Sequence, residues 1–152
     1  MDLREDPIIY SLSLCTIVDS EEGVDMDVVC TVPKPLWRTL LEEGDLPGEP
    51  FTGREYHFFG GGHVPRITLG ERVYIVAHGR LRGYAPLLRV ERAGVQRPAW
   101  WWYRASWALV RAGCAVACTL PTPIRGFRGY RYRFWERVEE MPFPAWQTEG
   151  VR

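Results

Sequence analysis

Short apolar runs separated by glycine, proline and acidic turns predict a chain built mainly from β-strands. Eight segments have the alternating or continuous apolar pattern that is typical of strands. The fourth and fifth are joined by the dipeptide His78-Gly79, which marks the clearest hairpin of the chain. The expected strands are residues 8–17, 28–32, 54–59, 72–77, 80–91, 98–106, 108–119 and 127–135.

One segment has the pattern of an amphipathic helix. In residues 33–43 (PKPLWRTLLEE), Leu36 and Leu40, and likewise Trp37 and Leu41, recur at helical spacing. We expect the side of the helix with Leu36, Leu40 and Leu41 to pack onto the open end of a barrel that contains the hairpin. Trp37 is then either a stacking side chain beside a cleft or the buried anchor of the helix.

Many short strands with one or two short helices predict a mainly β (α+β) fold, in the form of a small, partly closed β-barrel. A length of 152 residues fits a single domain over residues 1–152. Apolar and charged fractions of 46 % and 25 % exclude wholesale disorder. Residues 141–152 carry two prolines, and we expect them to be a loosely packed tail.

The charges of the chain are balanced in number but not in position. Residues 1–53 hold twelve acids and three bases, whereas residues 54–152 hold seven acids and sixteen bases. Either the basic part meets an anionic partner, or folding interleaves the two parts so that they screen each other. All the bases except Lys34 are arginine, whose planar fork suits phosphates and base edges.

The most basic stretch, residues 125–135, interleaves arginines with aromatic side chains. If residues 127–135 form a strand, Arg131 and Arg133 share one face and the tyrosines take the other. Together with Arg128 they would form a row able to meet a phosphate backbone; the alternative is a strand face that only solvates the fold. Arg80 and Arg82, on one face of the hairpin, favour a basic surface.

Residues 70–91 (GERVYIVAHGRLRGYAPLLRVE) resemble the ASCH domains of the PUA-like superfamily. The matching features are the Gly-Glu-Arg start, the apolar strand, the turn, and Gly83 in the next strand. Upstream, the Gly-Arg-Glu element at residues 53–55 also matches, although the family commonly has lysine where this chain has Arg54. The resemblance covers about residues 8–91, and it implies a PUA-like barrel that often binds RNA or modified bases in a cleft beside the helix.

This resemblance predicts that the protein binds RNA or another single-stranded or modified-base nucleic acid. The cleft should lie between the helix and the residues that follow Gly53. Arginines and a histidine would edge it, aromatic rings would stack on bases, and the later arginines would extend a basic track. The expected contact residues are Trp37, Arg54, His57, Arg80, Arg82, Tyr84, Arg128, Arg131 and Arg133.

Two other functions stay open. Some ASCH-like proteins are small amidohydrolases that act on acylated cytidine with a lysine, a threonine and a glutamate, and the candidates here would be Lys34, Thr52 and Glu55. Arg54 cannot replace such a lysine as a base, because arginine does not deprotonate near neutral pH. The other alternative is an adaptor or inhibitor whose acidic segment from Asp19 to Asp27 binds a basic protein.

The sequence predicts neither a metal site nor a cofactor. Its four cysteines include no Cys-x-x-Cys, and its three histidines include no His-x-x-x-His. No segment approaches the roughly 18–20 apolar residues that cross a bilayer. The start, MDLREDPIIY, has acids where a signal peptide needs bases. We therefore expect a cytoplasmic protein with no membrane partner.

Overall fold

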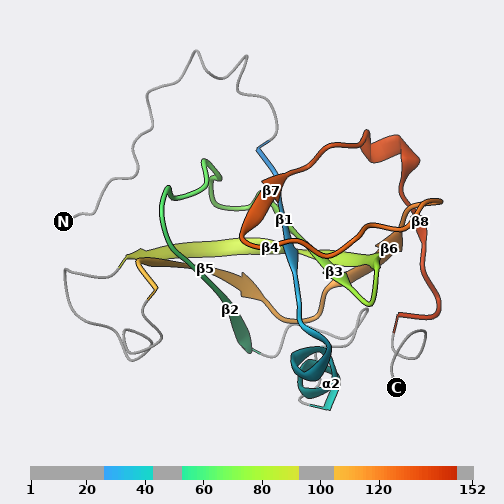
Figure 1. Ribbon diagram of the computed structural model, residues 1–152, viewed down its shortest axis with the longest axis horizontal. Helices are drawn as coiled ribbons and strands as arrows, with labels where there is room; N and C mark the ends of the chain where they lie inside the picture. Colours follow the sequence, from blue (N-terminus) through green and yellow to red (C-terminus); the bar gives the residue numbers. More distant parts are fainter. Residues whose placement is uncertain (1–25, 43–52, 93–104, 147–152) are drawn as a thin grey trace.

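The computed structural model describes residues 26–42, 53–92 and 105–146. This part is mainly β, with one α-helix and a sheet curled into half of a small barrel (Figure 1), which confirms the expected fold class. The elements in chain order are β1 Val28–Thr31, α2 Lys34–Glu42, β2 Glu55–Gly60, β3 Arg72–Ala77, β4 Arg80–Arg92, β5 Trp107–Ala112, β6 Val116–Thr119, β7 Tyr130–Tyr132, the 3-10 helix η5 Arg137–Glu139 and β8 Met141–Pro142.

The sheet has the strand order β2-β5-β4-β3-β1-β7, and β6 pairs with β4 and with β8 beside this path. Strand β1, next to the edge strand β7, runs parallel to β3 and antiparallel to β7. Strand β4 pairs with β3 and β6 through its first half and with β5 through its second half. Two β-bulges interrupt its pairing, and because a bulge bends a strand, they help the sheet to curl.

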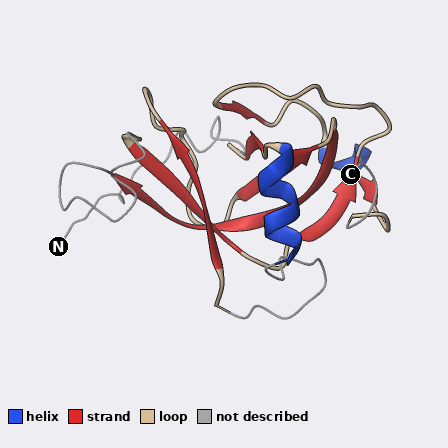
Figure 2. Ribbon diagram, turned by 60° about the horizontal axis from the view of Figure 1, so that its bottom comes forward, coloured by secondary structure: helices blue, strands red, loops and turns tan. Residues whose placement is uncertain are grey.

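Helix α2 packs against this sheet (Figure 2) through Trp37 and Leu40. Leu41 is half-buried on the same side, but Leu36 is 46 % exposed, so the expectation that Leu36 faces the barrel is wrong. The reason is helical geometry: residues three and four apart form one stripe, and the stripe here starts at Trp37.

The local strand predictions agree with the structure where the chain has clear turns. The expected strands 28–32, 54–59, 72–77 and 80–91 match β1 to β4 within one residue at each end. The expected strand 108–119 is instead two strands, because Gly113 and Cys114 form a turn in which Cys114 has a left-handed φ of 65°. Of the expected strand 127–135, only β7 forms.

Two other expected strands lie partly or wholly outside the described residues. Residues 8–17 are not described, and of residues 98–106 only the last two are, neither of which is in a strand. The tail behaves differently from expectation: Phe143 and Trp146 are buried, so loose packing is wrong for residues 141–146. Trp146 fits because Gly83 has no side chain; a Cβ there would lie 2.7 Å from its ring and 2.2 Å from a backbone oxygen of β6.

Candidate nucleic-acid interface

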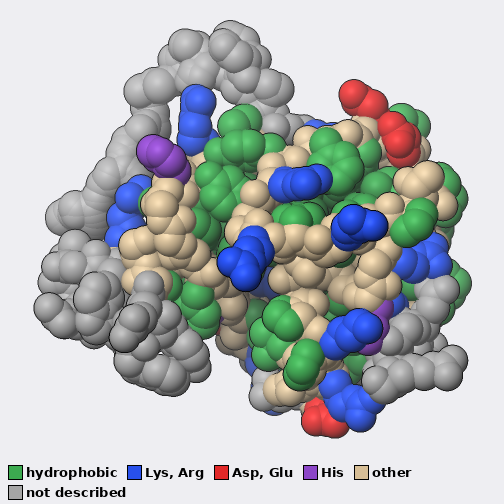
Figure 3. Space-filling model, viewed as in Figure 1, with side chains coloured by type: hydrophobic (Ala, Val, Ile, Leu, Met, Phe, Trp, Pro, Cys, Tyr) green, Lys and Arg blue, Asp and Glu red, His purple; other side chains and the backbone are tan. Residues whose placement is uncertain are grey.

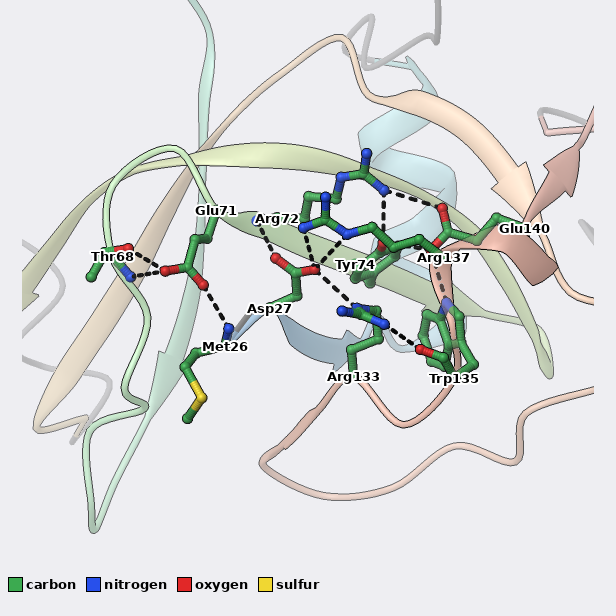
Figure 4. Close-up of polar contacts among 10 residues, drawn as sticks. All are labelled: Met26, Asp27, Thr68, Glu71, Arg72, Tyr74, Arg133, Trp135, Arg137 and Glu140. Carbon is green, nitrogen blue, oxygen red and sulfur yellow. Dashed lines mark hydrogen bonds and ion pairs between the residues drawn. The ribbon is translucent and has the colours of Figure 1, made fainter. Parts of the chain in front are cut away.

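Asp27, the residue before β1, is the centre of a buried ionic network (Figure 4). Its side chain is fully buried, and its Oδ1 accepts a hydrogen bond from the backbone N–H of Arg72 at 3.0 Å. Its Oδ2 accepts from Arg133 Nε at 3.0 Å and from Arg137 Nη2 at 2.7 Å. A buried carboxylate is tolerated only when it is paired and hydrogen-bonded in this way. Asp27 therefore ties the start of β1 to β3 and to the chain after β7.

A second carboxylate, Glu140, extends the network (Figure 4). It accepts hydrogen bonds from the Tyr74 hydroxyl at 2.5 Å, from Trp135 Nε1 at 2.9 Å and from Arg72 Nη1 at 3.2 Å. Burial and the hydrogen bond to Glu140 raise the pKa of Tyr74, so its hydroxyl remains protonated and donates. The Arg72 guanidinium also lies 3.9 Å from the centroid of the Tyr84 ring.

This network removes two expected contact residues from the surface. Arg133 does not share an open row with Arg131, because the strand ends at Tyr132 and Asp27 binds the Arg133 side chain, which is only 13 % exposed. Tyr84 is half-buried, and the ring face that a base would need is covered by Arg72. Asp27 itself is buried and does not project in an acidic segment from Asp19 to Asp27; the other acids of that segment lie outside the described residues.

Arg82 is also buried, which corrects its expected place beside Arg80 on a basic surface. Ile75 pairs with Gly83 and the next residue of β3 pairs with Leu81, so Arg82 is the extra residue of a β-bulge. A bulge breaks the alternation of side chains between the two faces of a sheet. Arg82 consequently turns inward, where its Nε donates to the carbonyl oxygen of the last residue of β3 at 3.0 Å.

Trp37 lies in the same interior region. Its ring is fully buried and packs edge-on against Trp146, with 5.0 Å between the ring centroids. The Arg82 guanidinium lies 5.5 Å from the Trp37 centroid. Of the two alternatives for Trp37, the structure thus has the buried anchor of the helix, and its ring presents no face to a base.

Arg54 and His57 lie on or beside the edge strand β2 and are exposed. The His57 ring stacks on Phe59 at 5.6 Å, and its Nε2 is 3.5 Å from Glu91 Oε1. Tyr56, on the same strand, packs against the cluster that contains Trp37. The expected cleft lined by a tryptophan ring is therefore not formed.

The candidate catalytic set is not brought together. Glu55 is bound by Arg89 through two hydrogen bonds of 2.7 and 2.9 Å, which lower the pKa of Glu55. Lys34 is exposed in the first turn of α2, and within the described ranges no hydrogen bond or ion pair joins it to Glu55. Thr52 lies outside the described residues.

The cysteines of the described part lie apart from any metal-binding group. Cys30 and Cys118 are buried, and burial raises the pKa of Cys118 to about 12. No cluster of three or more His, Cys, Asp or Glu side chains suited to a metal ion occurs among the residues that the structure describes. The only helices found there are too short or too polar to cross a membrane.

One group of basic and aromatic side chains remains on the surface, on β7 and its flanking segments. The Arg131 guanidinium lies 4.8 Å from the Phe127 ring centroid and 5.9 Å from that of Phe134. Arg131 is exposed and Phe134 is 56 % exposed. We name this group the Arg131 surface; its members are Arg125, Phe127, Arg128, Arg131 and Phe134.

Basic residues outnumber acidic ones in the described part of the chain. The described ranges hold 15 lysine and arginine residues against 8 aspartate and glutamate residues. Figure 3 shows basic side chains spread over β7 and the connection before it, with acidic side chains at the edges of this face. Phe127 and Phe134 were not among the expected contact residues; the signal for them was their interleaving with arginines in residues 125–135.

Comparison with known proteins finds no relative: no family model, no curated protein and no solved structure matches the chain.

Proposed function

We propose that this protein is a nucleic-acid-binding module that holds RNA or another single-stranded nucleic acid on the Arg131 surface. The observation that carries the proposal is the exposed Arg131 guanidinium held over the Phe127 ring at 4.8 Å. It differs from Arg133, whose side chain is bound by a buried carboxylate, because no hydrogen bond or ion pair to Arg131 is found among the described residues. Arg131 thus combines a fixed position with N–H groups that remain available to a ligand.

The chemistry of this arrangement suits a phosphate or a base. An arginine stacked on an aromatic ring keeps its in-plane N–H fork for bidentate contact with phosphate oxygens or base edges. Because the ring already restricts the side chain, less conformational entropy is lost on binding. Phe134 adds an exposed ring on which a base can stack, and such a contact is worth roughly 1–3 kcal/mol. Arg125 and Arg128 supply further positive charge for the backbone.

A single strand fits this surface better than a duplex. Stacking on Phe134 requires an open base face, and duplex bases cover their faces with one another. The ASCH-like features of residues 70–91 and the partly closed barrel are consistent with a PUA-like RNA binder, and we propose that classification together with the function. The Arg131 surface supports the proposal independently of it.

The test is binding of fluorescent single-stranded RNA, single-stranded DNA and duplex DNA of one sequence at several salt concentrations. The double variant Arg128→Ala, Arg131→Ala should bind single strands more weakly, with a salt slope reduced by about 1.4 if both residues contact phosphates. Phe134→Ala should weaken binding without changing the slope. Arg92→Ala, an exposed arginine at the end of β4, is the control for loss of charge alone. An unchanged slope in the double variant would overturn the proposal.

A further inference from the structure

The connection between β6 and β7 runs from the β3–β4 turn to the Arg131 surface. The backbone N–H of Ile124 donates to the carbonyl oxygen of Gly79, in the β3–β4 turn, at 2.8 Å. Three residues on, the N–H of Phe127 lies 3.4 Å from Oγ1 of Thr31, the last residue of β1. Arg125 is exposed between these two attachments. This member of the Arg131 surface therefore lies where the chain passes from the β3–β4 turn toward β7.

The start of α2 carries a second group of basic side chains. Helix α2 begins at Lys34, just after β1, and both Lys34 and Arg38 are exposed. Residues four apart lie one above the other on a helix, so these two cations share one side of α2. Figure 3 shows basic side chains both near α2 and over β7, with uncharged and apolar surface between them.

His78 completes the group from the β3–β4 turn. It has a left-handed φ of 51° and is followed by Gly79 at 72°, which is the backbone of a tight two-residue hairpin turn. Burial lowers the pKa of His78, and the charges of Arg82, Lys34 and Arg38 lower it further. The backbone sets these groups near one another: Thr31 pairs with Val76 in the parallel β1–β3 ladder, and the N–H of Val32 donates to the carbonyl oxygen of Val76 at 2.7 Å. The start of α2 and the β3–β4 turn therefore lie at the same end of the sheet.

We infer that Lys34, Arg38 and His78 form a phosphate-binding site, and that one single strand crosses both this site and the Arg131 surface, of which Arg125 is the member next to the β3–β4 turn. The choice of ligand rests on the proposed function; the site itself rests on the pairing of β1 with β3, which sets the start of α2 beside the β3–β4 turn. A phosphate bound there would relieve the repulsion among the cations. It would also favour the protonated imidazole, because an opposite charge nearby stabilises the charged form. Binding at this site therefore takes up a proton.

The experiment is a series of single-stranded oligonucleotides of increasing length, within the roughly 4 to 16 nucleotides that such binding domains cover. Wild type should gain affinity once a strand is long enough to reach the second site. The double variant Lys34→Ala, Arg38→Ala should lose this gain, by about tenfold or more, and should bind the shortest strands as wild type does. Arg92→Ala, which replaces an exposed arginine at the end of β4, is the matched control. The double variant and the control must both unfold at the same denaturant concentration as the wild-type protein, so that a loss of binding is not a loss of folding.

Proton uptake supplies an independent readout. The length-dependent gain should increase as the pH is lowered from 8 to 6 in wild type, and His78→Asn should remove this increase. Asparagine is chosen because it tolerates a left-handed backbone. The contrast with Arg128→Ala, Arg131→Ala separates the two hypotheses. If only the Arg128→Ala, Arg131→Ala variant loses binding, the second site is refuted and the proposed function stands. If only the Lys34→Ala, Arg38→Ala variant loses binding, the proposed function on the Arg131 surface is refuted. The Lys34→Ala, Arg38→Ala variant is also tested on phosphatidylserine vesicles. If it loses vesicle binding while its RNA binding stays unchanged at every length, the RNA site is refuted, because the ligand would then be a lipid surface.

Discussion

Arg131 and Arg133 are two residues apart in the same basic stretch, yet the structure gives them opposite environments. Arg131 is exposed and lies over an aromatic ring, whereas Arg133 is nearly buried and bound to Asp27. Both are the residue type that contacts nucleic acid, but only the Arg131 side chain is accessible to a ligand. The difference teaches that an arginine among aromatics is left available to a ligand only when no carboxylate of its own chain binds it.

The same division applies to the rest of the molecule. Arg72, Arg82 and Arg133 all serve the interior: the first and third bind carboxylates, and the second occupies a bulge and lies near the ring of Trp37. Exposed arginines occur instead on the β6–β7 connection, on β7 and on α2. Substitutions on the interior side should therefore change stability, and substitutions on the exposed side should change binding.

The largest loss of stability is expected from Trp37→Ala, on the interior side. The ring is fully buried between the sheet and Trp146, and removing it leaves a large cavity. The free energy of unfolding should fall by about 3–5 kcal/mol, measured by urea denaturation. Leu36→Ala, one residue earlier and 46 % exposed, should lose far less. A loss below about 1 kcal/mol for Trp37→Ala would show that this ring is not the anchor of the helix.

Asp27→Asn is expected to have the next largest effect. It removes the charge that pairs with Arg133 and Arg137, while the amide keeps part of the hydrogen bonding. Breaking one side of a buried ion pair costs about 3–5 kcal/mol, and we expect the lower end of that range. Glu42→Gln, at the exposed end of α2, is the control for a change of charge. Equal unfolding midpoints for the two variants would contradict a structural role for the Asp27 network.

Comparing Arg133→Ala with Arg131→Ala tests the division directly. The first removes a charge-assisted hydrogen bond to a buried carboxylate and should lower stability by about 1.5–3 kcal/mol. The second should change stability by no more than about 0.5 kcal/mol, because the side chain is exposed. Binding should respond in the opposite order, with Arg131→Ala losing more affinity per folded molecule. A reversed pattern in either measurement would show that the assignment of the two arginines is wrong.

The smallest effect concerns His78 and pH. Its pKa in the folded state is lowered from the usual 6.5, so below pH 6.5 the unfolded chain binds more protons at this position than the folded chain. Stability should therefore decline as the pH falls through that value, and His78→Asn should show a shallower decline. Unfolding curves between pH 5 and 8 measure the difference. Identical pH profiles would mean that the cations of α2 do not act on His78.

Local patterns predicted much of the fold but little of the arginine assignment. The β3–β4 hairpin and α2 were predictable because their signals, a two-residue turn and a helical stripe, lie within a few neighbouring residues. The Asp27 network could not be predicted, since Asp27 meets Arg72 and Arg133 only across β1, β3 and β7. In the sequence it is one acid in an acidic segment, without any local sign that it is buried.

The burial of Arg82 was missed for a related reason. Strict alternation along β4 places it with Arg80, and the bulge that turns it inward depends on pairing with β3 rather than on its own segment. The Arg131 surface was partly predictable, because arginines alternate with aromatics around it. The contacts that hold Arg125 beside the β3–β4 turn join segments far apart in the chain, and nothing in either segment indicates them.

The position of β1 between β3 and β7 has a consequence for how the chain folds. Val28 pairs with Val73 of β3 on one side and with Tyr132 of β7 on the other. Strand β1 is therefore synthesised before both of the strands that it pairs with. Such non-local pairing slows folding, because a long loop must close before the contact forms. During synthesis, the apolar segment Val28–Thr31 emerges from the ribosome well before either partner strand exists. An unpaired apolar strand is a template for aggregation, which makes this short segment the part of the nascent chain that a holding chaperone would protect.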